Sequence, residues 1–189
     1  VSFIIIDYLI VSAAKNGKID LEQTVAEKLS FIVLFYAIIG GRLGYIIFYD
    51  LNYYLLNLEK IFFIWEGGMS FHGGLIGATF GSIYLSNKYK VNFLNITDII
   101  SLYVPIGLFF GRIGNFINSE LYGVKTSGSW GVIFTSVDQY PRHPSMLYEA
   151  FLEGFVLFII LNYIINKRPP IGIISGYFLF FYGLFRFFI

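Results

Sequence analysis

The residues best suited to chemistry lie in one stretch, Gly111 to Gly123, which reads GRIGNFINSELYG. Where a long apolar run ends, it places Arg112, Asn115, Asn118 and Glu120. A guanidinium is a permanently charged planar fork that suits phosphate oxygens, and carboxamides can bridge ester or glycerol oxygens. The glutamate either orients the arginine or acts as a base. The alternative is a buried Arg112–Glu120 ion pair with only a structural role.

A second cluster, Trp65 to Gly74, contains a histidine followed by two glycines. A histidine can take a proton from a thiol or a hydroxyl near neutral pH, so His72 is a candidate base. Gly73 and Gly74 allow close approach of a backbone or a lipid headgroup. The alternatives are a histidine bonded to a neighbouring carbonyl at a helix start, and glycines that serve helix packing alone.

A third cluster, Pro141 to Ser145, leads into the next apolar run. His143 is either a second acid or base, or an organiser of the helix start. Ser145 is expected to cap that helix, because serine is a preferred N-cap residue. Glu149 and Glu153 then lie one turn apart on one helix face.

The last candidate, Arg186, lies near the end of the final apolar run. A lone arginine there can extend its charged head toward the interface. Together with Arg42 and Arg112 it can instead form a basic pocket at headgroup depth. The combined clusters suggest handling of an anionic lipid headgroup, by transfer or by binding.

Composition identifies the class of protein that must position these residues. The mean hydropathy is +0.70, and only 13% of residues are charged, against about a quarter in soluble domains. The sequence therefore predicts an all-α, polytopic transmembrane bundle. The absence of cysteine excludes disulfides and thiolate metal sites, and two histidines argue against a histidine-rich metal centre. We expect no metal, no cofactor and no nucleic-acid partner.

About six spans are expected, the first and last incomplete, in one membrane-embedded domain over residues 1–189 that is truncated at both ends. Small residues four apart, as at Gly73, Gly77 and Gly81, predict close helix packing in the third span. The aromatic stretch 50–66 is expected to be an interfacial arm, and a short strand is expected within 130–137. The expected spans are 1–14, 29–49, 70–85, 93–110, 147–165 and 171–189.

Loop charges predict the orientation of these spans. The short loops on one side carry the lysines and an arginine, which marks that side as cytoplasmic. The three clusters and the end of the last span then face the extracytoplasmic side. A small loop region is expected on that side. The basic residues on the cytoplasmic side are Lys15, Lys18, Lys28, Lys88, Lys90, Lys167 and Arg168.

Five blocks, in order, resemble the bacterial prolipoprotein diacylglyceryl transferase family. They are GGRLGYIIFY (40–49), GGMSFHGGLIG (67–77), GRIGNFINSELYG (111–123), RHPSMLYEA (142–150) and YGLFRF (182–187). The resemblance implies an enzyme of the bacterial inner membrane with seven membrane helices. It would move a diacylglyceryl group from phosphatidylglycerol to the lipobox cysteine thiol of a preprolipoprotein signal peptide. The products would be a thioether and glycerol phosphate, with no cofactor or metal.

By motif match, Arg112, Asn115 and Glu120 fall on the key polar positions of the family signature, His72 on its HGG histidine and Arg186 on its late arginine. Catalytic roles are therefore expected for His72, Arg112, Glu120 and Arg186. Phosphatidylglycerol binding is expected for Arg112, Asn115, Asn118, Gly73, Gly74 and His143. The tyrosine that the family carries in its first membrane helix has no counterpart we can place. A glutamate expected four residues after the late arginine would fall at position 190.

The competing interpretation is a non-enzymatic membrane protein, either a lipid or anion transporter or a scaffold. Transporters often show inverted repeats with broken helices at the midplane. No such repeat is evident, and the polar clusters gather on one side. A scaffold would not need Arg112, Asn115 and Glu120 at the membrane boundary, so transfer is the favoured prediction.

Overall fold

The computed structural model describes all 189 residues and is mainly helical. It divides into two compact units, residues 20–96 and residues 1–19 with 97–189, and each is described by itself. The units are composed of the helices α1 (Ser2–Lys15), α2 (Gln23–Tyr49), α3 (Leu51–Leu56), η1 (Leu58–Phe62), η2 (Ile64–Glu66), α4 (Phe71–Tyr89), α5 (Phe93–Ile117), α6 (Ser145–Glu149), η3 (Ala150–Val156), α7 (Leu157–Ile165) and α8 (Ile173–Phe188), and the strands β1 (Val132–Ile133) and β2 (Pro141–Arg142).

Three helical stretches are long and apolar enough to cross a membrane: α2, α5 and the continuous helix Ser145–Ile165. Each coincides with a predicted span. The apolar helix α8 also coincides with a predicted span, but it is shorter than these three helices. Helix α4 is not among the three. The helical membrane class is therefore confirmed, while the count of six spans stays a prediction.

Residues 20–96 are organised by the packing of α2 against α4. A Cβ on Gly73 would lie 2.9 Å from the Cα of Gly44, and one on Gly77 would lie 3.1 Å from the Cα of Gly40. Because the first distance is too short for two carbon atoms and the second is unusually tight, glycine at these positions permits the close crossing. The predicted role of the small residues in helix packing is confirmed. Ser70 caps α4 by accepting a hydrogen bond from the Gly73 N–H at 3.3 Å.

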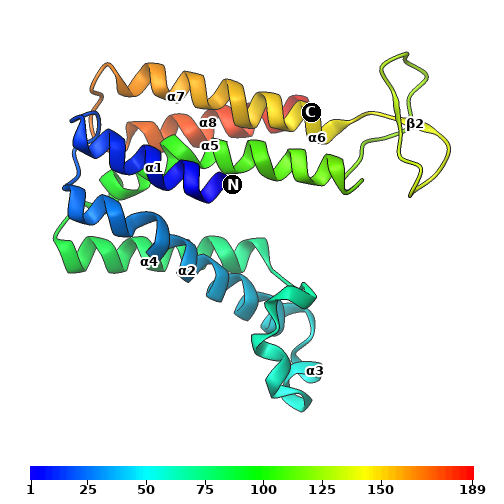
Figure 1. Ribbon diagram of the computed structural model, residues 1–189, viewed down its shortest axis with the longest axis horizontal. Helices are drawn as coiled ribbons and strands as arrows, with labels where there is room; N and C mark the ends of the chain where they lie inside the picture. The colour runs from blue at the N-terminus through cyan, green and yellow to red at the C-terminus, as the bar shows by residue number, and fades with distance from the viewer. The chain divides into compact units, whose positions relative to one another are not determined.

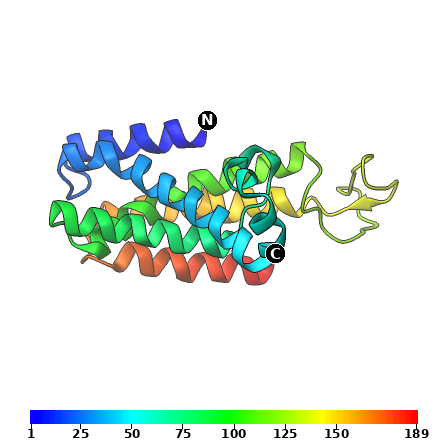
Figure 2. The same cartoon turned by 90° about the horizontal axis from the view of Figure 1, so that it is seen from below.

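The short helices α3, η1 and η2 lie at the C-terminal end of α2, before α4 begins (Figures 1 and 2). This segment exposes large apolar side chains, including Leu56, Phe62 and Trp65. Exposed aromatic rings of this kind suit headgroup depth. The interfacial placement of the arm stays a prediction.

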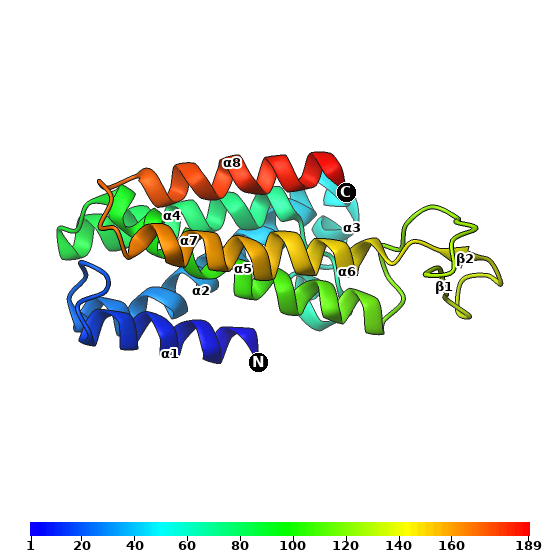
Figure 3. The same cartoon turned by 90° about the horizontal axis from the view of Figure 1, so that it is seen from above.

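In the other unit, α7 and α8 lie side by side, joined by the turn 166–172 (Figure 3). Asp98 of α5 fixes the start of α8. Its carboxylate accepts hydrogen bonds from the Gly172 N–H at 2.6 Å, and from the N–H and hydroxyl of Ser175 at 2.7 and 2.6 Å. Since the first N–H groups of a helix lack internal partners, this buried carboxylate acts as a cap supplied from another helix.

Helix α5 also packs closely against η3. Gly154 makes this approach possible, because a Cβ there would lie 2.6 Å from the Cβ of Phe109. The segment η3 is a π-helical turn within the continuous helix 145–165. Such turns widen a helix locally and are frequent at functional sites.

A loop with a small hairpin connects α5 to α6 and extends away from the ends of both helices (Figures 1 and 3). Strands β1 and β2 pair antiparallel, with Val132 opposite Arg142. The strand predicted within 130–137 is therefore confirmed, although it is only two residues long. Arg142 donates to Asp138 at 2.7 Å and lowers the pKa of that carboxyl.

Candidate active site

Two arginines from different helices converge on one carboxylate. Arg112, near the end of α5, places its Nε 2.6 Å from Oε2 of Glu149. Arg186, near the end of α8, places its Nη1 3.0 Å from the same oxygen and its Nη2 2.7 Å from Oε2 of Glu153. The four side chains form one network of two cations and two anions.

The network is buried on its acidic side. The Glu149 side chain is 9% exposed and that of Glu153 is 0% exposed, while Arg112 and Arg186 are 19% and 39% exposed. Unpaired charges in such surroundings are costly, so each carboxylate needs a cation nearby. The two guanidiniums supply this charge, and both side chains remain partly exposed.

The contacts to Glu149 are electrostatic rather than directional. Its Oε2 is close to both guanidiniums but makes no hydrogen bond, because neither N–H is aimed at it. Glu153 differs, since its Oε2 accepts a true hydrogen bond from Arg186. Arg186 Nη2 also lies 3.2 Å from the hydroxyl of Tyr182. Arg186 is thus bonded to Glu153 and held near Glu149 by charge.

Asn115 connects Arg112 to Glu120. Its Oδ1 accepts a hydrogen bond from Arg112 Nη1 at 3.4 Å, and its Nδ2 donates to Glu120 Oε2 at 2.9 Å. The Arg112–Glu120 ion pair considered from the sequence is wrong, because the anionic partner of Arg112 is Glu149. Glu120 can orient Arg112 only through Asn115. Asn118, at the end of the same block, is exposed.

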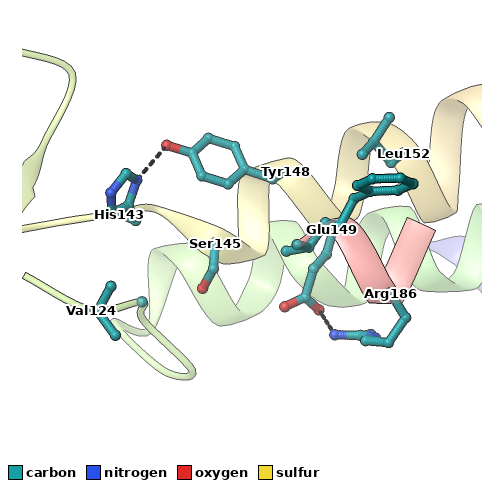
Figure 4. A pocket seen from close by; sticks show the side chains of 10 residues that line it. Val124, His143, Ser145, Tyr148, Glu149, Leu152 and Arg186 are labelled. Atoms are coloured by element: carbon teal, nitrogen blue, oxygen red, sulfur yellow. Dashed lines mark hydrogen bonds and ion pairs between the residues drawn. The ribbon is translucent and has the colours of Figure 1, made fainter. Parts of the chain in front are cut away.

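A cavity of about 720 Å³ lies beside the network. Figure 4 shows Arg186 and Glu149 on one part of its wall and His143 with Tyr148 on another. Nδ1 of His143 lies 3.3 Å from the hydroxyl of Tyr148. The structure therefore places His143 and Arg186 around one cavity, while the lipid-binding role of His143 stays a prediction.

The return of the loop to the membrane is fixed by contacts that the sequence did not reveal. Gly123 donates its N–H to the His143 carbonyl at 2.9 Å, and a Cβ at Gly123 would lie 2.8 Å from that oxygen. The capping role predicted for Ser145 is wrong. Ser145 is the first residue of α6, the cap position is Pro144, and the Ser145 hydroxyl donates to the Leu121 carbonyl at 3.0 Å.

His72, Gly73 and Gly74 belong to the separate unit 20–96. His72 is exposed in the first turn of α4, with its ring 5.6 Å from that of Phe71. Gly73 is buried against Gly40 and Gly44, so helix packing accounts for it. Gly74 is partly exposed. The roles of these three residues toward a substrate stay predictions.

Arg42 does not contribute its charge to a phosphate pocket, contrary to one option from the sequence. It is 4% exposed, and all five of its N–H groups are directed at backbone carbonyls. Nε donates to Ile61 at 3.0 Å, and the two terminal nitrogens donate to Lys60, Phe63, Gly67 and Gly68. Arg42 instead holds the segment that leads into α4.

Sequence reasoning placed Glu149 and Glu153 on one helix face but did not assign them a role in the site. The signal was present, because two carboxylates four residues apart inside an apolar helix need cationic partners. The sequence did not reveal which arginines supply them. That pairing depends on the packing of α5 and α8 around η3.

Three apolar helices long enough to cross a bilayer indicate a multi-pass helical membrane protein. The whole chain, residues 1–189, matches the family described as prolipoprotein diacylglyceryl transferase. The chain belongs to that family.

Relatives bear the name phosphatidylglycerol–prolipoprotein diacylglyceryl transferase. One from Nitratidesulfovibrio vulgaris strain DP4 is 46% identical over 175 residues, which are 93% of this chain and 66% of the relative. One from Geobacter sulfurreducens is 46% identical, covering 98% of this chain and 71% of the relative. One from Rickettsia akari is 55% identical, covering 79% of this chain and 59% of the relative. The chain thus spans 66% of the length of the first of these proteins.

Proposed function

We propose that the chain carries the reaction centre of a phosphatidylglycerol–prolipoprotein diacylglyceryl transferase. It moves the diacylglyceryl group to the lipobox cysteine of a preprolipoprotein and releases glycerol phosphate. The observation that carries the proposal is the convergence of Arg112 and Arg186 on Glu149 beside a cavity. The names of the relatives favour transfer over transport or a scaffold role.

The two guanidiniums bind the phosphate of phosphatidylglycerol. Nη2 of Arg112 and Nε of Arg186 make none of the contacts described above, and a guanidinium can present two donors to a phosphate at once. Negative charge builds up on the phosphate as the glycerol carbon–oxygen bond breaks. Donors fixed in advance at that place stabilise the transition state more than the ground state.

The thiolate sulfur of the incoming cysteine attacks the glycerol carbon of the diacylglyceryl group. A carbon–sulfur bond forms, the carbon–oxygen bond breaks, and its electron pair leaves with glycerol phosphate. A free thiol has a pKa of about 8.5, so a positive local potential favours the reactive thiolate. His72 takes the thiol proton. No cofactor or metal takes part in these steps.

The remaining predicted residues bind the lipid headgroup. Asn115 and Asn118 face ester and glycerol oxygens, and Glu120 orients Asn115 and through it Arg112, which the 2.9 Å Asn115–Glu120 bond supports. His143, on the cavity wall with Arg186, contacts the headgroup. Gly73 and Gly74 allow the lipid to approach next to His72.

The enzyme lies in the bacterial inner membrane with its active site on the extracytoplasmic side. The basic short loops support this orientation. We further propose six spans in residues 1–189 and a single membrane-embedded domain, with the exposed arm 50–66 at the interface. Its partners are phosphatidylglycerol and the signal peptide that carries the lipobox.

The test is mass spectrometry of a lipobox peptide incubated with the purified protein and phosphatidylglycerol. A diacylglyceryl mass gain on the cysteine is expected, with glycerol phosphate released in equal amount. The same incubation with phosphatidylcholine is the control and is expected to give no gain. If the lipid binds and no gain is seen with either donor, the transport interpretation replaces transfer.

The roles of the base and the phosphate-binding arginines can be separated by two variants. Arg112→Ala should abolish transfer, because the phosphate loses a cation that stabilises the leaving group. His72→Gln should slow transfer most at low pH, where few thiols ionise unaided. Near-normal turnover of His72→Gln at every pH would remove His72 from the mechanism and leave the phosphate-binding role intact.

A further inference from the structure

We propose that Glu149 is an internal competitor for the phosphate subsite. It lies between the guanidiniums of Arg112 and Arg186 when no phosphate is bound, gives way to the phosphate, and returns when the phosphate leaves. The identification of the phosphate as a lipid headgroup rests on the proposed function. The competition itself rests on the geometry around Glu149.

The first observation is the position of Glu149. A single oxygen, Oε2, lies 2.6 Å from Arg112 Nε and 3.0 Å from Arg186 Nη1. A phosphate oxygen that bridged the two arginines would occupy the same place, because guanidinium groups bind carboxylate and phosphate in similar geometry. Carboxylate and phosphate therefore exclude one another there.

The second observation is that the short contacts of Glu149 Oε2 with the two arginines are ion pairs without hydrogen-bond geometry. Oε2 accepts no hydrogen bond from either arginine, although it is buried. Hydrogen bonds to charged groups are among the stronger bonds in proteins, so Glu149 lacks a directional bond of the kind that holds Glu153. Glu153, by contrast, is hydrogen-bonded to Arg186 at 2.7 Å and keeps its place.

The third observation is charge. Two arginines and two glutamates are neutral together, so the site without a ligand has no net attraction for an anion. A phosphate diester that enters beside both carboxylates leaves the site with an uncompensated negative charge, which is costly in a buried place. Withdrawal of Glu149 from the guanidiniums removes the closest repulsion. The cavity of about 720 Å³ that Glu149 lines gives its carboxylate room to move.

This competition explains how a tightly binding site can release its product. Glycerol phosphate carries more negative charge than the diester from which it is formed, so two bare guanidiniums would retain it. The return of Glu149 offers them an alternative anion and lowers the affinity for the product. Glu149 is thus a positioning and release residue, and it takes no part in the bonds that form and break.

The test compares phosphate binding to the wild-type protein and to Glu149→Gln, both in phosphatidylcholine nanodiscs. In one arm, glycerol phosphate is titrated into the protein and its affinity is measured by calorimetry. In the other arm, phosphatidylglycerol is added to the nanodisc and its affinity for the protein is measured. We expect Glu149→Gln to bind tighter by on the order of tenfold, the lower end of what one neighbouring charge does to an ionisation equilibrium. Glu59→Gln removes the same charge from an exposed position and is expected to change nothing.

A gain in affinity is a result that damage to the fold would not produce. A gain for phosphatidylglycerol assigns the subsite to the lipid headgroup, and a gain for glycerol phosphate alone assigns it to the released product. Unchanged or weaker binding in both arms overturns the proposal. If Glu149→Gln does not fold, Glu149→Asp replaces it, because its shorter side chain cannot reach both arginines and should also raise the affinity.

Turnover provides an independent readout. Glu149→Gln should lower the KM for phosphatidylglycerol and lower kcat, because the product leaves more slowly. If no lipobox peptide is modified by any variant while phosphate affinity still rises, the transferase function fails and the competition stands. If wild-type transfer is normal and phosphate affinity does not rise, the competition fails and the transferase function stands.

Discussion

Replacement of Gly154 by alanine tests whether the packing of η3 on α5 positions the arginine network. A Cβ at Gly154 would lie 2.6 Å from the Cβ and 2.8 Å from the Cα of Phe109. Carbon atoms pack at about 3.5–4.0 Å, so the two segments must separate by roughly 1 Å. Phe109 lies one turn before Arg112, and Gly154 follows Glu153, so the separation acts directly on the ion-paired side chains.

The expected magnitude combines two opposing effects. Overpacking costs about 1–3 kcal/mol, and alanine stabilises a helix over glycine by about 1 kcal/mol. The obstructing atoms include backbone and cannot rotate away, which favours the upper part of the overpacking range. A net loss of about 1–2 kcal/mol corresponds to a fall in Tm of about 2–8 °C for a chain of this size.

The effect on catalysis should be larger than the effect on stability. The Arg112–Glu149 distance is 2.6 Å, and a misplacement of roughly 1 Å can cost about a hundredfold in rate. Tm is followed by far-ultraviolet circular dichroism as a function of temperature, and transfer by the mass gain of a lipobox peptide.

Gly176→Ala in α8 is the matched control. A Cβ there meets nothing within 4 Å, so the same chemical change should raise stability by up to about 1 kcal/mol and leave transfer unchanged. A Tm at or above wild type for Gly154→Ala, with normal transfer, would refute the claim that this contact positions the site.

Three further changes test the contacts that support the site. Arg42→Lys offers three donors in place of five, so the segment 60–68 should loosen and trypsin should cleave after Lys60 faster than in wild type. Asp98→Asn replaces one of the two acceptor oxygens at the first turn of α8 with an N–H donor and should cost about 1–3 kcal/mol of stability, seen as a lower Tm. The Asp138 pKa is lowered from 3.8, chiefly by its hydrogen bond from Arg142. The hairpin should therefore keep this contribution above pH 3.8 and lose it as the pH falls through the lowered pKa, seen as faster amide exchange.

The sequence predicted the elements better than their contacts. Apolar length and composition predicted spans at 93–110 and 147–165, which lie within the helices 93–117 and 145–165. Glycines four apart predicted close packing of the third span, although not that α2 is its partner. These properties depend on local pattern. A short strand was predicted within 130–137, but its partner β2 was not, since strand pairing is a contact between distant segments.

In the candidate site, too, the sequence predicted the residues better than their contacts. The types of residue that gather there were predicted, but Arg112 was expected to pair, if at all, with the nearby Glu120. The structure pairs it with Glu149, which lies 37 positions away and is brought near by the Gly154–Phe109 contact. Likewise Arg42 was a candidate for a basic pocket, whereas five carbonyls from residues 60–68 satisfy it. Competition between such partners is decided by packing, which a single sequence does not specify.

The most direct test of the account is an experimental structure of the protein with phosphatidylglycerol bound. The account predicts that the lipid phosphate lies within hydrogen-bond distance of both Arg112 and Arg186, with Glu149 withdrawn from at least one of them. A phosphate bound elsewhere, with both arginines still on Glu149, would contradict it.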